Sequence, residues 1–77
     1  MLTSPKLSVV SPCYNEQDSL EELCRRVTAA CEAEVGADYE IVLIDDGSSD
    51  STRSLIGKLC EKDPHFVGVF LSRNHGH

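Results

Sequence analysis

Short apolar runs and amphipathic stretches alternate along the chain. The apolar runs cover residues 7–11, 40–44 and 66–72, and they are rich in valine, isoleucine, leucine and phenylalanine. Runs of this length and composition predict buried β-strands. After each of the first two runs, apolar residues recur at steps of three and four, which is typical of an amphipathic α-helix. The pattern therefore predicts a β-α-β-α-β order of elements.

The predicted helices have recognisable ends. Asp18 and Ser19 each have a glutamate three residues further on, which is the pattern of a capping box at the start of a helix. Gly36 is expected to end this first helix. Ser49 or Asp50 is expected to cap the second helix, because both residue types accept a hydrogen bond from the first free N–H groups of a helix.

This order of elements belongs to the α/β class and predicts a three-stranded parallel sheet with right-handed crossover connections. If the strands lie side by side in a steady order, both helices cover the same face of the sheet. The strand segments are nonetheless apolar on successive residues, as in strands that are buried on both faces. One apolar face is therefore expected to stay uncovered, which predicts a fragment of a larger protein or a chain that self-associates through this face.

Acidic residues dominate the charge of the chain. The formal net charge is −6, and eleven of the thirteen Asp and Glu residues lie between Glu16 and Asp50. Such a surface repels the phosphates of nucleic acids and of anionic lipids, so neither is an expected partner. No apolar stretch reaches the roughly 18 residues of a membrane span, and the sequence predicts a cytoplasmic protein.

The cysteines are spread along the chain without a CxxC pair or a Cys/His spacing that suits zinc. We expect them to be reduced thiols that are largely buried. They are Cys13, Cys24, Cys31 and Cys60.

The loops that follow the three strands carry most of the candidate chemistry. They cover residues 12–16, 45–50 and 72–77. In open parallel sheets, ligands bind beyond the carboxyl ends of the strands, so these loops are expected to form one polar rim. An aromatic ring, carboxylates and an arginine on this rim can stack on a base, accept hydrogen bonds from base or ribose, and pair with phosphate.

Three motifs in this order resemble the opening of family 2 glycosyltransferases. They are LSVVSPCYNEQDSLEEL from Leu7, YEIVLIDDGSSDST from Tyr39 and FLSRNHGH from Phe70. Together they cover nearly all of the chain, and they are most similar to the polyprenyl-phosphate sugar transferases, which include dolichyl-phosphate mannosyltransferases and bactoprenol glucosyltransferases. The resemblance implies that residues 1–77 form the N-terminal, nucleotide-binding half of a Rossmann-like GT-A domain.

The resemblance also implies roles for individual residues of the rim. Pro12, Tyr14 and Glu16 line the nucleotide pocket at the end of the first strand. Ile44 and Asp46 flank the base and the ribose, and Asp46 accepts an N–H of the base.

Further roles follow from the same resemblance. Asp45 and Asp50 support the site by orienting the turn and by capping the second helix. Three residues of the third loop lie near the sugar diphosphate: Arg73, Asn74 and Gly76.

Simpler structural roles remain open for four of these residues. Asp50 is explained by a helix N-cap and Asp45 by the turn alone. Glu16 is favourable near the start of a helix because of the helix dipole, and Arg73 can be an exposed loop end. A dinucleotide-binding unit is not expected, because the loop after the first strand reads SPCYNE and lacks the glycine-rich turn.

For the complete enzyme, the resemblance implies transfer of a sugar from a UDP- or GDP-linked donor to a polyprenyl phosphate at the cytosolic face of a membrane. Mg²⁺ or Mn²⁺ would neutralise the diphosphate. The family's metal-binding Asp-x-Asp and its catalytic acidic residue come later in the chain, so no catalytic residue and no metal ligand is expected among the 77 residues. The alternative is a truncated, non-catalytic nucleotide-binding or interaction module.

Overall fold

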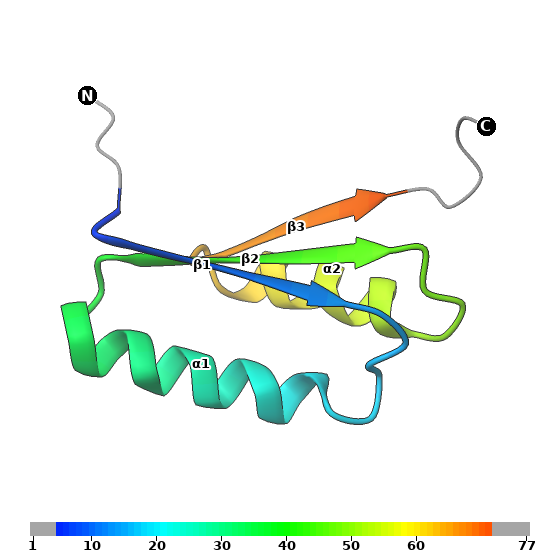
Figure 1. Cartoon of the computed structure of the whole chain (residues 1–77), viewed down its shortest axis with the longest axis horizontal. Coiled ribbons are helices and arrows are strands. Elements are labelled where there is room, and N and C mark those ends of the chain that lie inside the picture. The colour runs from blue at the N-terminus through cyan, green and yellow to red at the C-terminus, as the bar shows by residue number, and fades with distance from the viewer. Residues whose placement is uncertain (1–4, 72–77) are drawn as a thin grey trace.

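The structure is a computed structural model that describes residues 5–71 (Figure 1). Its elements are β1 (Leu7–Cys13), α1 (Leu20–Val35), β2 (Tyr39–Asp46), α2 (Thr52–Lys62) and β3 (Phe66–Leu71). The strands form one sheet in the order β1-β2-β3, and both pairs are parallel. The predicted order of elements and the predicted parallel sheet are confirmed.

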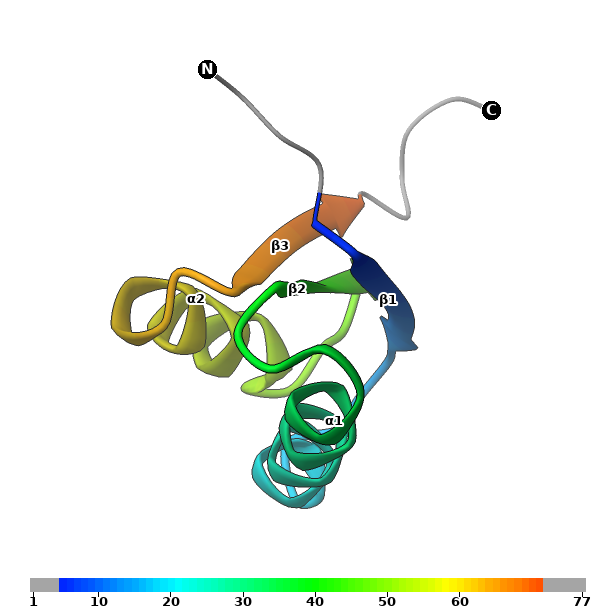
Figure 2. The ribbon, with the colours of Figure 1, turned by 90° about the vertical axis from the view of Figure 1, so that its left-hand side faces the viewer.

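The fold has two layers, because both helices cover the same face of the sheet (Figures 1 and 2). Ile41 and Leu43 of the central strand β2 point toward the helices and are fully buried. Leu20 of α1 and Ile56 of α2 are buried in the same core cluster. The apolar stripe of each helix is therefore what holds it on the sheet.

Two strands extend further than predicted at their carboxyl ends. β1 continues through Pro12 to Cys13, although the proline was expected to begin a loop. Among residues 5–71, β1 has a neighbour only on its β2 side, and a proline is tolerated in such an edge strand because its missing N–H costs no ladder bond. β2 likewise includes Asp45 and Asp46, which were expected in the loop that follows it.

The predicted start of α1 at Ser19 and its predicted end at Gly36 are confirmed, but the predicted capping box does not form. α1 begins at Leu20 after Ser19, but the Ser19 hydroxyl donates to Glu16 and forms no cap bond. The capping box is absent because Glu16 engages both groups of Ser19 that would form it: its side chain accepts the hydroxyl, and its main-chain carbonyl accepts the N–H. Gly36 ends the helix with φ of 68°, a left-handed conformation that glycine adopts without strain.

The start of α2 also differs from the prediction. The helix begins at Thr52, so the N-cap position is Ser51, and neither Ser49 nor Asp50 occupies it. Asp50 still accepts the N–H of Thr52 at 2.9 Å, although it lies one residue before the N-cap.

The expected uncovered apolar face is confirmed for the part of the chain between Pro5 and Leu71. Side chains that alternate with the buried ones lie on the side of the sheet away from the helices. Val10, Val67 and Leu71 on this side are 58%, 41% and 42% exposed. We call this surface the open face, and it consists of Val10, Pro12, Val42, Ile44, Val67, Val69 and Leu71.

The four cysteines are free thiols, as predicted, and three of them are buried. Burial raises the pKa of Cys24 to about 11 and also raises the pKa values of Cys13 and Cys60. None of the helices described is long and apolar enough to cross a membrane.

Candidate functional site

The loop after β1 and the loop after β2 lie against each other at the carboxyl edge of the sheet. Cys13 and Asp45, near the ends of the two strands, are direct neighbours in the parallel register. Three consecutive N–H groups of the first loop donate to side chains of the second loop or of Thr52, the first residue of α2. Their bonds run from Asn15 to the Ser48 hydroxyl (2.8 Å), from Glu16 to the Thr52 hydroxyl (2.7 Å) and from Gln17 to the Asp50 carboxylate (3.3 Å).

The second loop returns hydrogen bonds to the first. The N–H of Ser49 donates to the Asn15 side-chain oxygen, and the N–H of Ser51 donates to the Gln17 side-chain oxygen, each at 2.9 Å. Together with the three bonds above, they form five reciprocal contacts between loops that lie more than 30 residues apart in sequence, and we call them the interloop bonds. They join the two loops into one unit.

Asp45 belongs to the core of this unit. Its side chain is 0% exposed on the helix side of the sheet. One carboxylate oxygen accepts the N–H groups of Gly47 and Ser48, both at 3.1 Å, and lies 3.5 Å from the Arg53 side chain. The other oxygen has no hydrogen-bond partner in the part of the chain that the structure describes. Asp45 therefore orients the turn, where Gly47 adopts φ of 76°.

Asp46 points to the opposite side of the sheet from Asp45. As the last residue of β2 it is exposed, and it lies on the same side as Ile44. Ile44 pairs in register with Pro12 of β1, so these three residues meet at the carboxyl end of the open face. Tyr14 follows β1 directly and is 46% exposed. The structure thus places three of the predicted nucleotide-site residues, Pro12, Ile44 and Asp46, on one side of the sheet. Tyr14 comes two residues after Pro12 in the sequence.

The remaining predicted residues are placed less directly. The Glu16 side chain accepts a hydrogen bond from the Ser19 hydroxyl at 3.0 Å, so its carboxylate lies at the start of α1. Arg73, together with Asn74 and Gly76, lies outside the described residues. Their roles stay predictions.

Most N–H groups of the loop after β2, and the first N–H of α2, are already used within the protein. Those of Gly47 and Ser48 donate to Asp45, and the N–H of Thr52 donates to Asp50. Those of Ser49 and Ser51 take part in the interloop bonds. A glycine-containing loop before a helix often binds phosphate through free N–H groups, but this one has few left to offer.

Carboxylates give this edge a negative character. Asp50 accepts hydrogen bonds from the Thr52 hydroxyl and from the N–H groups of Thr52 and Gln17, and these bonds lower the pKa of its carboxyl. Arg53 is a nearby cation, and its guanidinium lies 5.2 Å above the ring of Phe70, on the helix side. Such an edge suits hydrogen-bond donors of a base or ribose better than it suits phosphate.

Sequence reasoning missed Asn15, Gln17, Thr52 and Arg53. Asn15 has φ of 52°, and asparagine is one of the few residues that adopt this left-handed conformation readily. That preference is a local signal for Asn15. The other three residues gave no signal, because their partners are distant in sequence.

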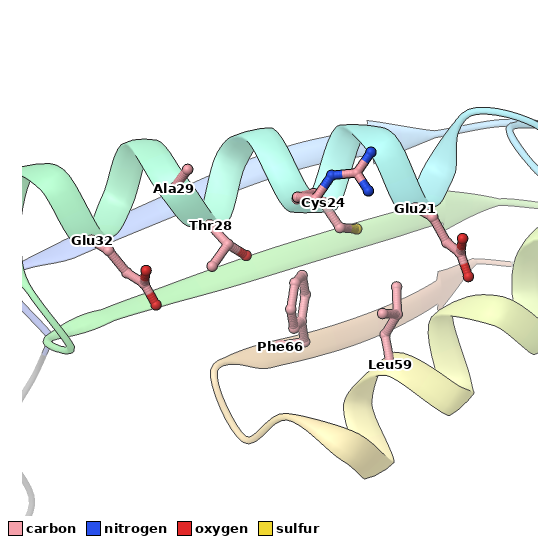
Figure 3. Close-up of a pocket in the computed structure, with 8 residues that line it drawn as sticks. Glu21, Cys24, Thr28, Ala29, Glu32, Leu59 and Phe66 are labelled. Atoms are coloured by element: carbon pink, nitrogen blue, oxygen red, sulfur yellow. The ribbon is translucent and has the colours of Figure 1, made fainter.

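A separate hollow lies on the helix side of the sheet (Figure 3). It has a volume of about 370 Å³, and Cys24 and Thr28 of α1 face Leu59 of α2 and Phe66 of β3 across it. It contains none of the predicted site residues. Within residues 5–71, no group of three or more His, Cys, Asp or Glu side chains is arranged to hold a metal ion.

Comparisons with known proteins agree with the motifs. Residues 8–77 match the sequence profile of glycosyl transferase family 2. The chain is 57% identical over 72 residues to the undecaprenyl-phosphate 4-deoxy-4-formamido-L-arabinose transferase of Enterobacter sp. (strain 638), covering 92% of this chain and 22% of that protein. The protein of the same name from Klebsiella pneumoniae is 55% identical over 80 residues, covering 99% and 24%.

A solved structure has the same arrangement of elements. It is a mannosyltransferase from Pyrobaculum calidifontis in complex with GDP-Man and Mn²⁺, which matches with a TM-score of 0.69 and 27% identity over 97% of this chain and 22% of its own. The present chain therefore spans about a fifth of the length of the relatives it matches. Since the family profile covers almost the whole sequence, this chain belongs to glycosyl transferase family 2.

Proposed function

We propose that the protein to which this chain belongs transfers a sugar from a nucleotide-diphosphate sugar to a polyprenyl phosphate. Two findings support this. The curated relatives are named undecaprenyl-phosphate sugar transferases, and the solved neighbour is a mannosyltransferase in complex with GDP-Man. Because a polyprenyl phosphate is a membrane lipid, this acceptor would place the complete enzyme at the cytosolic face of a membrane.

Within this enzyme, the chain supplies the part of the donor site that holds the base and the ribose. The observation that carries the proposal is the separation of the two neighbouring aspartates. Asp45 is buried and orients the turn, whereas Asp46 is exposed beside Ile44 and Pro12. The exposed Asp46 carboxylate can accept an N–H of a base or a ribose hydroxyl, and Tyr14 offers a ring on which a base can stack.

The diphosphate would lie away from the loop after β2. The loop's N–H groups donate to protein side chains, and the carboxylates of Asp46 and Asp50 would repel phosphate. Arg73 is the basic residue that we propose near the diphosphate. The base end of the donor is therefore the end that this part of the protein recognises.

The complete enzyme would use Mg²⁺ or Mn²⁺, and the neighbouring structure contains Mn²⁺. Such an ion would neutralise the leaving diphosphate. The described residues do not fit this role, because the Asp45 side chain is turned into the core, Asp50 is engaged with Thr52 and Gln17, and no cluster of three ligands forms. We therefore propose that its ligands lie in sequence beyond this chain, and that the chain alone transfers no sugar.

Titration calorimetry with UDP and GDP tests the proposal. We expect weak binding, near millimolar, which corresponds to about 4 kcal/mol. Asp46→Ala should weaken it by roughly ten-fold or more, since a hydrogen bond to a charged group contributes about 1.5–3 kcal/mol. Tyr14→Ala should also weaken it.

Asp38→Ala is the matched control, because Asp38 is an exposed aspartate just before β2, at the opposite edge of the sheet. It should bind nucleotide like the unchanged chain. Binding that is indifferent to both Tyr14→Ala and Asp46→Ala, or measurable sugar transfer by the 77 residues alone, contradicts the proposal.

A further inference from the structure

The five interloop bonds are reciprocal, and this is what distinguishes them from ordinary loop contacts. The first loop donates three N–H groups and, through the Asn15 and Gln17 side chains, accepts two main-chain N–H groups of the second loop. Every member is either a main-chain N–H or a side chain that reaches across to one. The arrangement resembles a short ladder in which side-chain oxygens take the place of a neighbouring strand.

Asn15 and Gln17 each take part in two of the interloop bonds. Their own N–H groups donate to Ser48 and Asp50, and their side-chain oxygens accept from Ser49 and Ser51. Each residue thus closes a two-bond ring between the loops. Both residues are exposed, so neither is needed to fill the core.

The interloop bonds lie close in sequence to the two proposed ligand contacts, Tyr14 and Asp46. Tyr14 directly precedes Asn15, and Asp46 comes two residues before Ser48. Asp46 is fixed as the last residue of β2, whereas Tyr14 lies in the loop after β1. A base that stacks on Tyr14 and donates to Asp46 therefore requires this loop to hold a fixed position relative to the carboxyl end of β2. Without cross-links, two polar loops of this kind would sample several arrangements, and only a fraction of molecules would be competent to bind.

We propose that Asn15 and Gln17 are positioning residues, whose side-chain oxygens hold the loop after β2 against the loop after β1 and so preset the gap that receives the base. They act through Tyr14 and Asp46 and do not contact the nucleotide. This inference rests on the proposed function, because it assigns Asn15 and Gln17 to the same nucleotide site.

Asn15→Gly is the most selective perturbation. Glycine adopts the φ of 52° found here without strain, so the change removes the side-chain oxygen and leaves the main-chain donor in place. Asn15→Asp is the matched rescue variant, because its carboxylate keeps an acceptor at the same atom. Gln17→Ala and Gln17→Glu form a second pair with the same logic.

The experiment has two independent readouts on the chain. Amide hydrogen exchange measures whether the interloop bonds are lost. The Ser49 N–H should exchange faster in Asn15→Gly, and the Ser51 N–H should exchange faster in Gln17→Ala. Titration with UDP and GDP reports the site. It is made at a temperature where circular dichroism shows every variant folded. The buffer contains 0.3 M salt, at which the Debye length is about 5.7 Å, so the added charges of the Asp and Glu variants are screened.

Asn15→Gly and Gln17→Ala should each weaken binding by roughly three- to ten-fold, the range that loss of one net hydrogen bond produces. Asn15→Asp and Gln17→Glu should restore affinity to within about twofold, which a purely structural role would not require. If exchange becomes faster while affinity is unchanged, the positioning role is wrong and the proposed function stands. If the unchanged chain binds neither nucleotide, the proposed function fails, and this inference fails with it.

Discussion

Gly57 of α2 and Gly68 of β3 should change the stability in opposite directions when each is replaced by alanine. Gly68 lies in β3 where α2 packs on the sheet. A Cβ atom there would come within 2.9 Å of Ile56 Cγ2, 3.2 Å of Phe70 Cζ and 3.3 Å of Cys60 Sγ. Ile56 is fully buried and has no room to retreat. Gly57, in α2 itself, would place a Cβ with nothing within 4 Å.

The magnitudes follow from these contacts. Gly68→Ala overpacks a filled site, which costs about 1–3 kcal/mol of unfolding free energy. Gly57→Ala replaces a glycine within a helix by a better helix former, and it should raise the unfolding free energy by about 0.5–1 kcal/mol. The two variants should therefore differ by about 1.5–4 kcal/mol, and each kcal/mol shifts the melting temperature of a domain this small by roughly 4–8 °C.

Thermal and urea unfolding, followed by far-UV circular dichroism at a protein concentration where sedimentation shows a monomer, measures both effects. Gly68→Ala should melt below the unchanged chain and Gly57→Ala above it. If Gly68→Ala is as stable as the unchanged chain, β3 does not pack against Ile56 as described. If Gly57→Ala is less stable, position 57 is not an open position on a helix.

Three further outcomes are expected. Thiol titration of the folded chain should be slow for Cys24, whose pKa burial raises to about 11, and fastest for the half-buried Cys60; rapid reaction of all four thiols contradicts the packing. Val10→Lys should reduce both the binding of a hydrophobic dye and self-association, because it places a charge on the open face. If neither changes, the open face is not the surface through which the chain associates. The hydrogen bond with Asp63 raises the pKa of His65, so its contribution to stability is complete below about pH 6.5 and is lost as pH rises through the raised value. The N–H of His65 lowers the pKa of Asp63, so the contribution of Asp63 to stability is present above about pH 4 and is lost as pH falls further. In urea unfolding at several pH values, His65→Gln should abolish the loss of stability on the alkaline side.

Most of the fold could be predicted from the sequence, because hydrophobic periodicity reports burial directly. The β-branched runs identified all three strands, and the steps of three and four identified both helices. The strand ends were missed where polar or proline residues continue a strand. Pro12 and Asp46 look like loop residues locally, but pairing with the neighbouring strand decides their conformation.

The candidate site was predictable to a smaller extent. The motifs brought Pro12, Ile44 and Asp46 to attention, and the sheet register places them together. Local pattern could not show that Asp45 and Asp46 point to opposite faces, because that required knowing that β2 includes both. Nor could it reveal the partners of Gln17, which lie 33 and 34 residues further along the chain and are brought near only by the fold.

The central claim is that the carboxyl edge of the sheet holds the base and ribose of a nucleotide donor. NMR shift mapping of the isotope-labelled chain with GDP and UDP tests it most directly, because every amide reports separately. The largest shifts should fall in residues 12–16 and 44–50, and Asp46→Ala should remove them. Shifts concentrated instead around Cys24 and Leu59, at the hollow on the helix side, or no shifts at millimolar nucleotide, would contradict it.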